Sequence, residues 1–144
     1  MVRLRPHHLL CMLTYVGKGY GPRFVANYDF IVARLNAGEG IRVVEGPDEI
    51  CAGALDLPGC HCRDESVRRR DAQARSALQT IVGPLEEMEL SPRRLAMLRA
   101  RFTEGSIRSA CAGCEWFDLC SRVAGSGYAQ AKLRPAAGSR APCS

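Results

Sequence analysis

Apolar residues recur three or four positions apart in several segments of the chain, which is the spacing of one face of an α-helix. The helices predicted from this pattern are Pro22 to Gly38, residues 65–82, Ser91-Pro92 to Gly105, and a short segment after Cys114. Proline in the first turn and glycine after the last turn are typical helix boundaries. The residues predicted to face inward are Phe24, Tyr28, Ile31, Leu35, Val67, Ala74, Leu78, Ile81, Leu95, Leu98, Phe102, Trp116, Leu119 and Val123.

The segment from Pro6 to Gly17 predicts a helix of a different kind. Residues 9–16 contain no charged side chain and few polar groups. A helix that is apolar on nearly all sides belongs in the core of a protein. Three residues of this helix have chemically versatile side chains, namely His7, His8 and Cys11.

Two short segments have the character of β-strands. Val2–Arg5 alternates apolar and basic residues, and Ile41–Val44 is rich in β-branched residues. We expect these two segments to pair in a minor two-stranded element. The predicted fold class is therefore mainly α, a small domain of four to five helices with little β-structure.

The composition is that of an ordinary globular domain. Of the 144 residues, 47% are apolar and 24% are charged, and a chain of this length can bury a core without cross-links. The chain has no apolar run long enough for a membrane span and no clear signal peptide, so we expect a cytoplasmic protein. The net charge of +5 comes from arginines spread along the chain, which favours a solvated basic surface over a nucleic-acid-binding site.

Eight cysteines are unusual for a cytoplasmic chain of this length. In that compartment clustered cysteines are typical of metal ligands or reactive thiols, whereas disulfides form in oxidising compartments. Six of the eight fall in two local groups, Cys51, Cys60 and Cys62, and Cys111, Cys114 and Cys120. Grouping of this kind indicates a shared ligand site.

The run Cys111-x2-Cys114-x5-Cys120 can bring three thiolates to one metal centre. A Cys-x2-Cys hook directs two sulfurs at the same point, and Gly113 frees the backbone for the tight turn. A [4Fe-4S] cluster needs a fourth ligand. The upstream candidates are Cys51 and Cys62, with Cys60 as the third choice.

Zinc is the alternative metal. A zinc site commonly takes its four ligands from two hooks, but this chain has one Cys-x2-Cys hook, and Cys60-His61-Cys62 lacks the usual spacing. The ligand pattern therefore favours an iron–sulfur cluster. We expect residues 1–131 to form a single iron–sulfur binding domain organised around a buried metal cluster. Residues 132–144, rich in Pro, Ala, Gly and Ser, are expected to form a flexible tail.

The ligand motif resembles two known iron–sulfur motifs. A distant cysteine followed by Cys-x2-Cys-x5-Cys is similar to the iron staple of Cas4/AddB-type nucleases, and the same run resembles the auxiliary-cluster motif of SPASM domains in radical enzymes. Both hold a [4Fe-4S] cluster, so the resemblance implies the cluster type. It does not imply their activities, because the acidic metal site of the nucleases and the barrel of the radical enzymes have no counterpart in 144 residues.

A broader resemblance covers nearly the whole chain. The segments that carry it are Arg5-Pro-His-His-Leu-Leu-Cys11, Gly17-Lys-Gly-Tyr20, Pro47-Asp-Glu-Ile-Cys51, the stretch from Cys62 to Asp71, and Cys111-x2-Cys-Glu-Trp116. Together they are similar to DUF1284, a prokaryotic domain-of-unknown-function family whose members are predicted to bind iron–sulfur clusters or metals. The family pattern matches at Cys11, Cys51, Cys62, Cys111, Cys114 and Cys120.

His7 and His8 leave further chemistry open. They precede Cys11 by four and three residues, so all three approach one face of a helix. His7, His8 and Cys11 are possible substitute ligands, and the histidines could also handle protons beside the cluster. The alternative is that the histidines make ordinary structural hydrogen bonds.

These observations predict a [4Fe-4S] protein with a redox role, either transferring electrons to a partner protein or sensing. One alternative is a structural cluster or zinc site that stabilises a partner-binding or nucleic-acid-binding module. Another is a small enzyme with an open iron site or a reactive thiol. The sequence contains no nucleotide-binding glycine loop and no Ser-His-Asp order, so enzymatic activity stays an open question.

Overall fold

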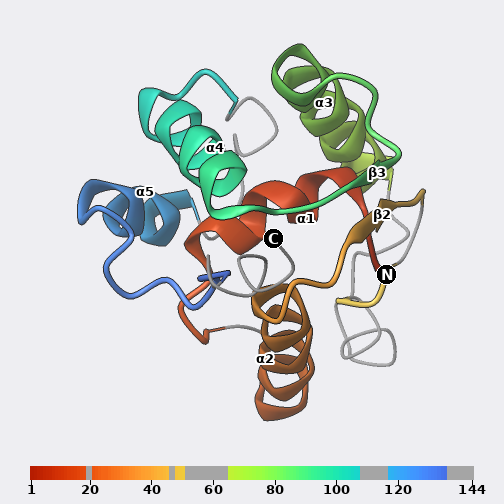
Figure 1. Ribbon diagram of the computed structural model, residues 1–144. Coiled ribbons are helices and arrows are strands. Elements are labelled where there is room, and N and C mark those ends of the chain that lie inside the picture. Colours follow the sequence, from red (N-terminus) through yellow and green to blue (C-terminus); the bar gives the residue numbers. More distant parts are fainter. Residues whose placement is uncertain (19–20, 46–47, 51–64, 108–116, 136–144) are drawn as a thin grey trace, which may run out of the picture.

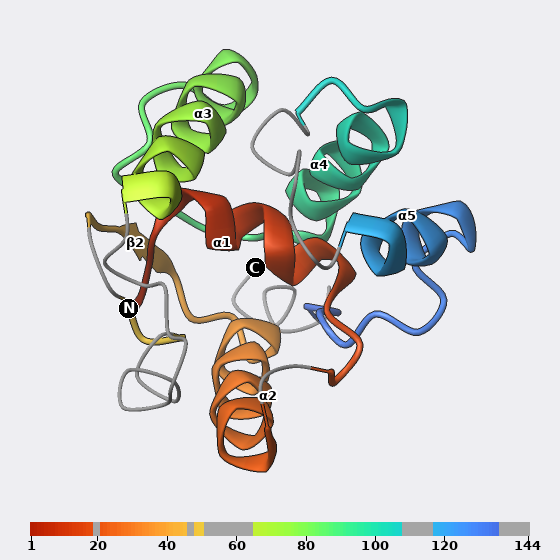
Figure 2. The same cartoon turned by 180° about the vertical axis from the view of Figure 1, so that it is seen from behind.

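The first helix lies at the centre of the computed structural model, and the other helices surround it (Figure 1, Figure 2). The structure describes residues 1–18, 21–45, 48–50, 65–107 and 117–135. The helices of this part are α1 (Pro6–Cys11), the 3-10 helix η1 (Met12–Thr14), α2 (Pro22–Asn36), α3 (Glu65–Val82), α4 (Pro92–Glu104) and α5 (Phe117–Gly125). The predicted mainly α architecture is therefore confirmed.

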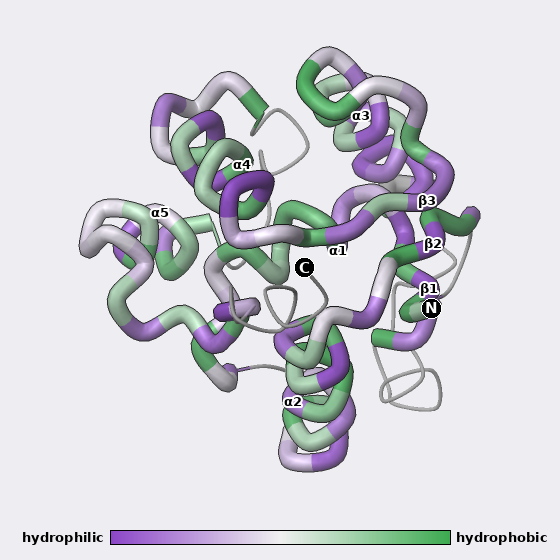
Figure 3. Tube along the Cα trace, viewed as in Figure 1, coloured by the Kyte–Doolittle hydropathy of each residue, from purple (hydrophilic) through white to green (hydrophobic). Residues whose placement is uncertain are grey.

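α1 and η1 supply much of the hydrophobic core. Leu9, Leu10, Met12 and Leu13 are each at most 1% exposed, and burying a large aliphatic side chain stabilises a fold by roughly 1.5–3 kcal/mol. Figure 3 shows that α1 begins with hydrophilic residues and ends with hydrophobic ones. The prediction of a buried helix in this segment is confirmed.

The helical segment ends at Thr14, earlier than the predicted stop at Gly17. Its last turn tightens into a 3-10 helix, and the backbone of Tyr15 is extended, with ψ of 126°. The guanidinium of Arg99 donates to the carbonyl oxygen of Leu13 at 3.0 and 3.1 Å. A contact from α4 therefore satisfies a carbonyl that has no helical partner at this end.

A small sheet, whose first strand leads into α1, packs one face on the core. β1 (Val2–Leu4) pairs in parallel with β2 (Ile41–Val43), and β2 pairs antiparallel with β3 (Glu87–Met88). The pairing of the first two strands was predicted. The third strand was not, because two residues are too few to show an alternating pattern. The expected two-stranded element is thus a three-stranded sheet in the order β1-β2-β3.

The boundary signals of the longer helices act as predicted. α4 is the clearest case: Ser91 Oγ accepts a hydrogen bond from the Arg94 N–H at 3.1 Å, and Gly105 ends the helix at a φ of 88°. α5 turns Val123 toward the core, whereas Trp116, predicted to lie inward on the same helix, is outside the described residues. No described helix is both long and apolar enough to cross a membrane.

The chain stays part of the fold beyond the predicted domain boundary. Leu133 is completely buried, and the backbone N–H of Lys132 donates to the carbonyl of Tyr15 at 2.9 Å. The buried side chain of Leu133 thus packs this segment against the core, while the predicted division into a domain and a flexible tail stays a prediction. Residues 136–144 lie outside the described part of the chain.

Candidate cysteine site at the first helix

Two of the candidate cysteine ligands lie in the described part of the chain. Cys11 ends α1 and Cys120 lies in α5; both are partly buried, and neither is assigned to a disulfide. The remaining predicted or substitute cysteine ligands lie outside the described residues, namely Cys51, Cys60, Cys62, Cys111 and Cys114. Their assignment as ligands stays a prediction.

Thr14 links the two described cysteines. Its Oγ1 lies 3.1 Å from Cys120 Sγ and 3.4 Å from the carbonyl oxygen of Cys11. The hydroxyl can donate to the sulfur, and a donor directed at a sulfur favours its thiolate form. The fold therefore brings the sulfur at the end of the Cys-x2-Cys-x5-Cys run to the last turn of the first helix.

Tyr28 is buried between these elements. Its side chain comes from α2, is 5% exposed, and stacks on Tyr15 with ring centroids 3.8 Å apart. The pKa of Tyr28 is raised well above its ordinary value, first by burial and then by the charges of Cys11, Asp48, Tyr15 and Cys120. The charges of both described cysteines thus act on this phenol, and it stays protonated.

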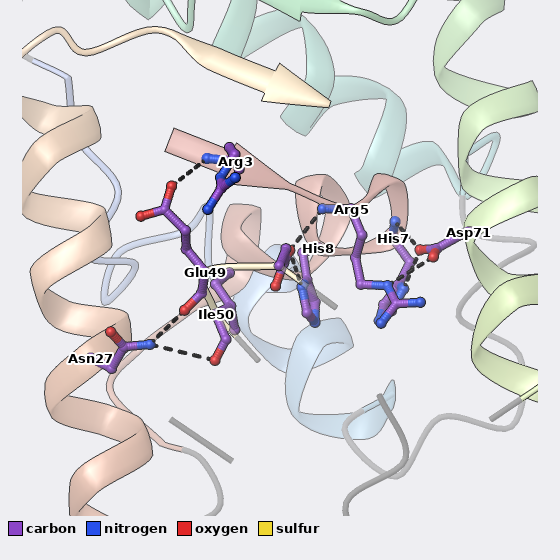
Figure 4. A network of polar contacts seen from close by, with 9 residues as sticks. Arg3, Arg5, His7, His8, Asn27, Glu49, Ile50 and Asp71 are labelled. Atoms are coloured by element: carbon purple, nitrogen blue, oxygen red, sulfur yellow. Dashed lines mark hydrogen bonds and ion pairs between the residues drawn. The ribbon is translucent and has the colours of Figure 1, made fainter. Parts of the chain in front are cut away.

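Each histidine of α1 contacts its own carboxylate through Nδ1. His7 Nδ1 lies 2.6 Å from Asp71 Oδ1, and His8 Nδ1 lies 2.7 Å from Asp48 Oδ2. Figure 4 shows His7 turned toward Asp71 of α3. An ionised carboxylate can only accept, so Nδ1 of each ring donates in its contact. This carboxylate–imidazole pattern suits either proton handling or metal ligation.

Arg5 joins the two carboxylates. Its side chain is 1% exposed and donates from Nε to Asp71 Oδ2 at 2.8 Å, while its backbone N–H donates to Asp48 Oδ2 at 2.7 Å. The alternation of Val2–Arg5 would have placed Arg5 outward with Arg3. β1 ends one residue earlier, however, and the turn into α1 directs the side chain inward (Figure 4).

The electrostatics favour a neutral His7 beside an ionised Asp71. Burial lowers the pKa of His7, and this effect outweighs the hydrogen bond to Asp71, which raises it. Burial raises the pKa of Asp71, but the hydrogen bonds from His7 and Arg5 outweigh it, so the pKa of this carboxyl is lowered. The guanidinium of Arg5 is therefore the positive partner of the pair.

This pair predicts a loss of stability in mild acid. The pKa of His7 in the folded protein lies below its ordinary value of 6.5, so below that pH the unfolded chain takes up a proton that native His7 does not bind. The stabilisation is complete above pH 6.5 and is lost as the pH falls. Asp71, whose folded pKa lies below 3.8, adds a loss in the same direction at lower pH.

Urea denaturation between about pH 7.5 and pH 5 measures this effect. His7→Gln removes the titrating ring but keeps an amide that can donate to Asp71. We expect the unfolding free energy to fall less steeply with decreasing pH in the variant than in the wild type. Equal slopes for the two proteins would contradict the lowered pKa of His7.

Several residues of the site were not predicted as functional. Asp71 offered a signal, because it lies on the apolar face of α3 between Val67 and Ala74, at the spacing of core positions. A carboxylate at a core position requires a buried partner, and Arg5 supplies it. Thr14 offered no signal of this kind, because a threonine in a buried helix is unremarkable.

The described residues do not complete a metal site by themselves. Among them, no three histidine, cysteine or acidic side chains are grouped so that they could hold a metal ion. They do supply two cysteine side chains outside any disulfide, a hydroxyl donor directed at one sulfur, and a buried phenol. Thiolates are the ligands of iron–sulfur clusters and of other soft metal centres.

A model of a known protein family matches most of the chain. Residues 19–120 match the family model described as "Protein of unknown function (DUF1284)". Comparisons with curated proteins and with solved structures gave no significant match. The matched range includes Tyr28, Asp48, Asp71 and Cys120, so the contacts described above join α1 to elements of the family's own domain. Because the family model matches well over half of the residues, this chain belongs to the DUF1284 family of proteins of unknown function.

Proposed function

We propose that this protein binds a [4Fe-4S] cluster on cysteine thiolates and uses it in a redox role, either transferring electrons or sensing. Three ligands come from the run that ends at Cys120, namely Cys111, Cys114 and Cys120. The observation that carries the proposal is the position of the Cys120 sulfur, the last of this run, 3.1 Å from Thr14 Oγ1, which also lies 3.4 Å from the carbonyl oxygen of a second cysteine, Cys11.

Cys11 is a candidate for the fourth ligand alongside Cys51 and Cys62. Two contacts support it. Thr14 Oγ1 is within hydrogen-bonding distance of both the Cys11 carbonyl and the Cys120 sulfur. The charges of both cysteines act on the same buried phenol, that of Tyr28. Thiolates from different elements of a fold can ligate one inorganic core.

The surroundings of the thiols support a redox role over a purely structural one. A cluster's potential is set by its burial and by hydrogen bonds to its sulfurs. Thr14 offers a hydroxyl to one ligand sulfur, and Tyr28 brings a second hydroxyl into the same region of the core. Donors of this kind are one of the means by which a protein sets the potential of a cluster.

Anaerobic purification followed by iron, sulfide and zinc analysis tests the proposal. We expect a brown protein with about four iron and four sulfide per chain, the composition of a cuboidal cluster. A colourless protein with one zinc and no sulfide would contradict it and would favour the structural zinc site. Reversible reduction with an unchanged circular dichroism spectrum would then support the redox role over a structural cluster.

A further inference from the structure

The hydroxyl of Tyr28 is buried in a position that destabilises the folded protein. It is buried, and none of the described residues accepts or donates a hydrogen bond to it. A buried hydroxyl without a partner destabilises the fold, because it has lost its hydrogen bonds to water without replacing them. A phenylalanine at position 28 would fill the same space without an unpaired hydroxyl. The neighbouring ring of Phe24, whose centroid lies 5.8 Å from that of Tyr28 in an edge-on arrangement, packs in the core without any hydroxyl. The hydroxyl therefore needs an explanation beyond packing.

The neighbouring tyrosine shows what a satisfied hydroxyl looks like in this core. Tyr15 stacks almost parallel on Tyr28, with an interplanar angle of 3°. Its hydroxyl donates to Asp29 Oδ1 at 2.8 Å and lies 3.3 Å from the carbonyl of Val25. Two adjacent phenols thus differ in one respect: only that of Tyr15 has a hydrogen-bond acceptor within the described part of the chain.

The groups around the Tyr28 hydroxyl indicate which acceptor it is placed to meet. The charged neighbours that act on it are Cys11, Asp48, Tyr15 and Cys120. Asp48 Oδ2 already accepts from the Arg5 N–H and from the His8 ring, and Tyr15 donates to Asp29. The other two neighbours are the thiols of the candidate cluster site, where Thr14 already offers a hydroxyl to Cys120.

We propose that the Tyr28 hydroxyl donates a hydrogen bond to a sulfur atom of the bound cluster, either a ligand Sγ or an inorganic sulfide, and thereby raises the cluster's reduction potential. This inference rests on the proposed cluster. Tyr28 acts here as a positioning and tuning residue that contacts the cofactor without ligating it. The Tyr28 hydroxyl has no acceptor among the described residues, and the bound cluster would supply that acceptor.

The sign of the effect follows from the charge of the cluster. Reduction adds one electron, so a hydrogen bond to sulfur is stronger in the reduced state. Removing the donor should therefore disfavour reduction. A hydrogen bond to a charged group is stronger than one to a neutral group, so we expect loss of the donor to lower the reduced-to-oxidised ratio at fixed potential by up to about tenfold. For a one-electron couple, tenfold corresponds to about 59 mV.

Tyr28→Phe and the matched control Tyr15→Phe test the inference by redox titration of the anaerobically purified proteins. We expect the midpoint potential of Tyr28→Phe to shift to more negative values by up to the amount given above. Tyr15→Phe should leave it unchanged, because the Tyr15 hydroxyl is bonded to Asp29. A Tyr28→Phe protein with a full cluster and an unchanged potential overturns the inference and leaves the proposed function intact. Wild-type protein without iron and sulfide overturns both.

A second measurement does not depend on the Tyr28→Phe protein keeping its cluster. Tyrosine carrying a magnetic oxygen isotope in its hydroxyl is incorporated into the wild type and Tyr15→Phe. Electron–nuclear double resonance of the reduced cluster should then detect a coupling to the labelled oxygen in both proteins. A reduced cluster that shows no such coupling in the wild type overturns the inference.

Discussion

Cys120→Ser is expected to lower the iron and sulfide content of anaerobically purified protein by at least about tenfold. Loss of an outer-shell partner already lowers metal affinity roughly ten- to a hundredfold, and loss of a direct ligand should cost at least as much. A serine hydroxyl is far less acidic than a thiol and is a poor ligand for iron in a sulfur cluster. Thr14 can still hydrogen-bond the serine, so the packing of α5 on η1 should persist. The measurement is iron and sulfide per chain, with circular dichroism to verify the fold.

The matched control is Cys143→Ser. Cys143 lies near the end of the chain, apart from both cysteine groups of the sequence, and we expect it to be no ligand. This variant should keep the wild-type content of iron and sulfide. Full iron and sulfide in Cys120→Ser would show that Cys120 is not a ligand, whatever the chain binds.

The second large effect concerns the buried ion pair between Arg5, at the start of α1, and Asp71 of α3. Arg5→Met should lower the unfolding free energy by about 3–5 kcal/mol, the usual cost of removing one partner of a buried pair. The variant leaves Asp71 buried at 13% exposure, with the neutral His7 ring as its remaining side-chain donor among the contacts described above. Since domains are stable by about 5–15 kcal/mol, this is a large share of the total. Urea denaturation followed by circular dichroism measures it.

Arg42→Met is the matched control for that experiment. Arg42 pairs with Glu87 across β2 and β3 at 2.6 Å, but the two side chains are 57% and 51% exposed. Exposed pairs contribute about 0.2–1 kcal/mol, so this variant should unfold near the wild-type midpoint. Similar losses in Arg5→Met and Arg42→Met would mean that burial does not decide the strength of the Arg5–Asp71 pair.

Local signals predicted most of the helical fold. Helix starts at Pro22 and Ser91-Pro92 and the stop at Gly105 are set by residues within one turn of the boundary. The same holds for the buried character of the first helix, which follows from its own composition. Such features depend on neighbours in the sequence, so they can be read without the rest of the chain.

Features that depend on distant contacts were missed or displaced. The early end at Thr14 depends on Arg99, which is bonded to the Leu13 carbonyl, and the packing of the segment after residue 131 depends on the burial of Leu133. The inward turn of Arg5 depends on Asp71, which lies 66 positions away. No local pattern encodes such partners.

The candidate site was predicted in part for the same reason. The cysteine spacing and the identity of His7, His8 and Cys11 were visible in the sequence, but not the pairing of the two histidines with Asp71 and Asp48. The arrival of Cys120 beside Thr14 also needed the packing of α5 on η1. The predicted ligands Cys51, Cys62, Cys111 and Cys114 lie outside the described residues and stay predictions.

Mössbauer spectroscopy of anaerobically purified protein carrying the Mössbauer-active iron isotope tests most directly whether cysteine sulfurs of this chain converge on one cuboidal core. The account predicts a spectrum of mixed-valence iron, each atom tetrahedrally surrounded by sulfur, which the Cys120→Ser protein largely lacks. A spectrum of single iron sites with nitrogen or oxygen ligands, or iron that Cys120→Ser retains in full, would contradict it.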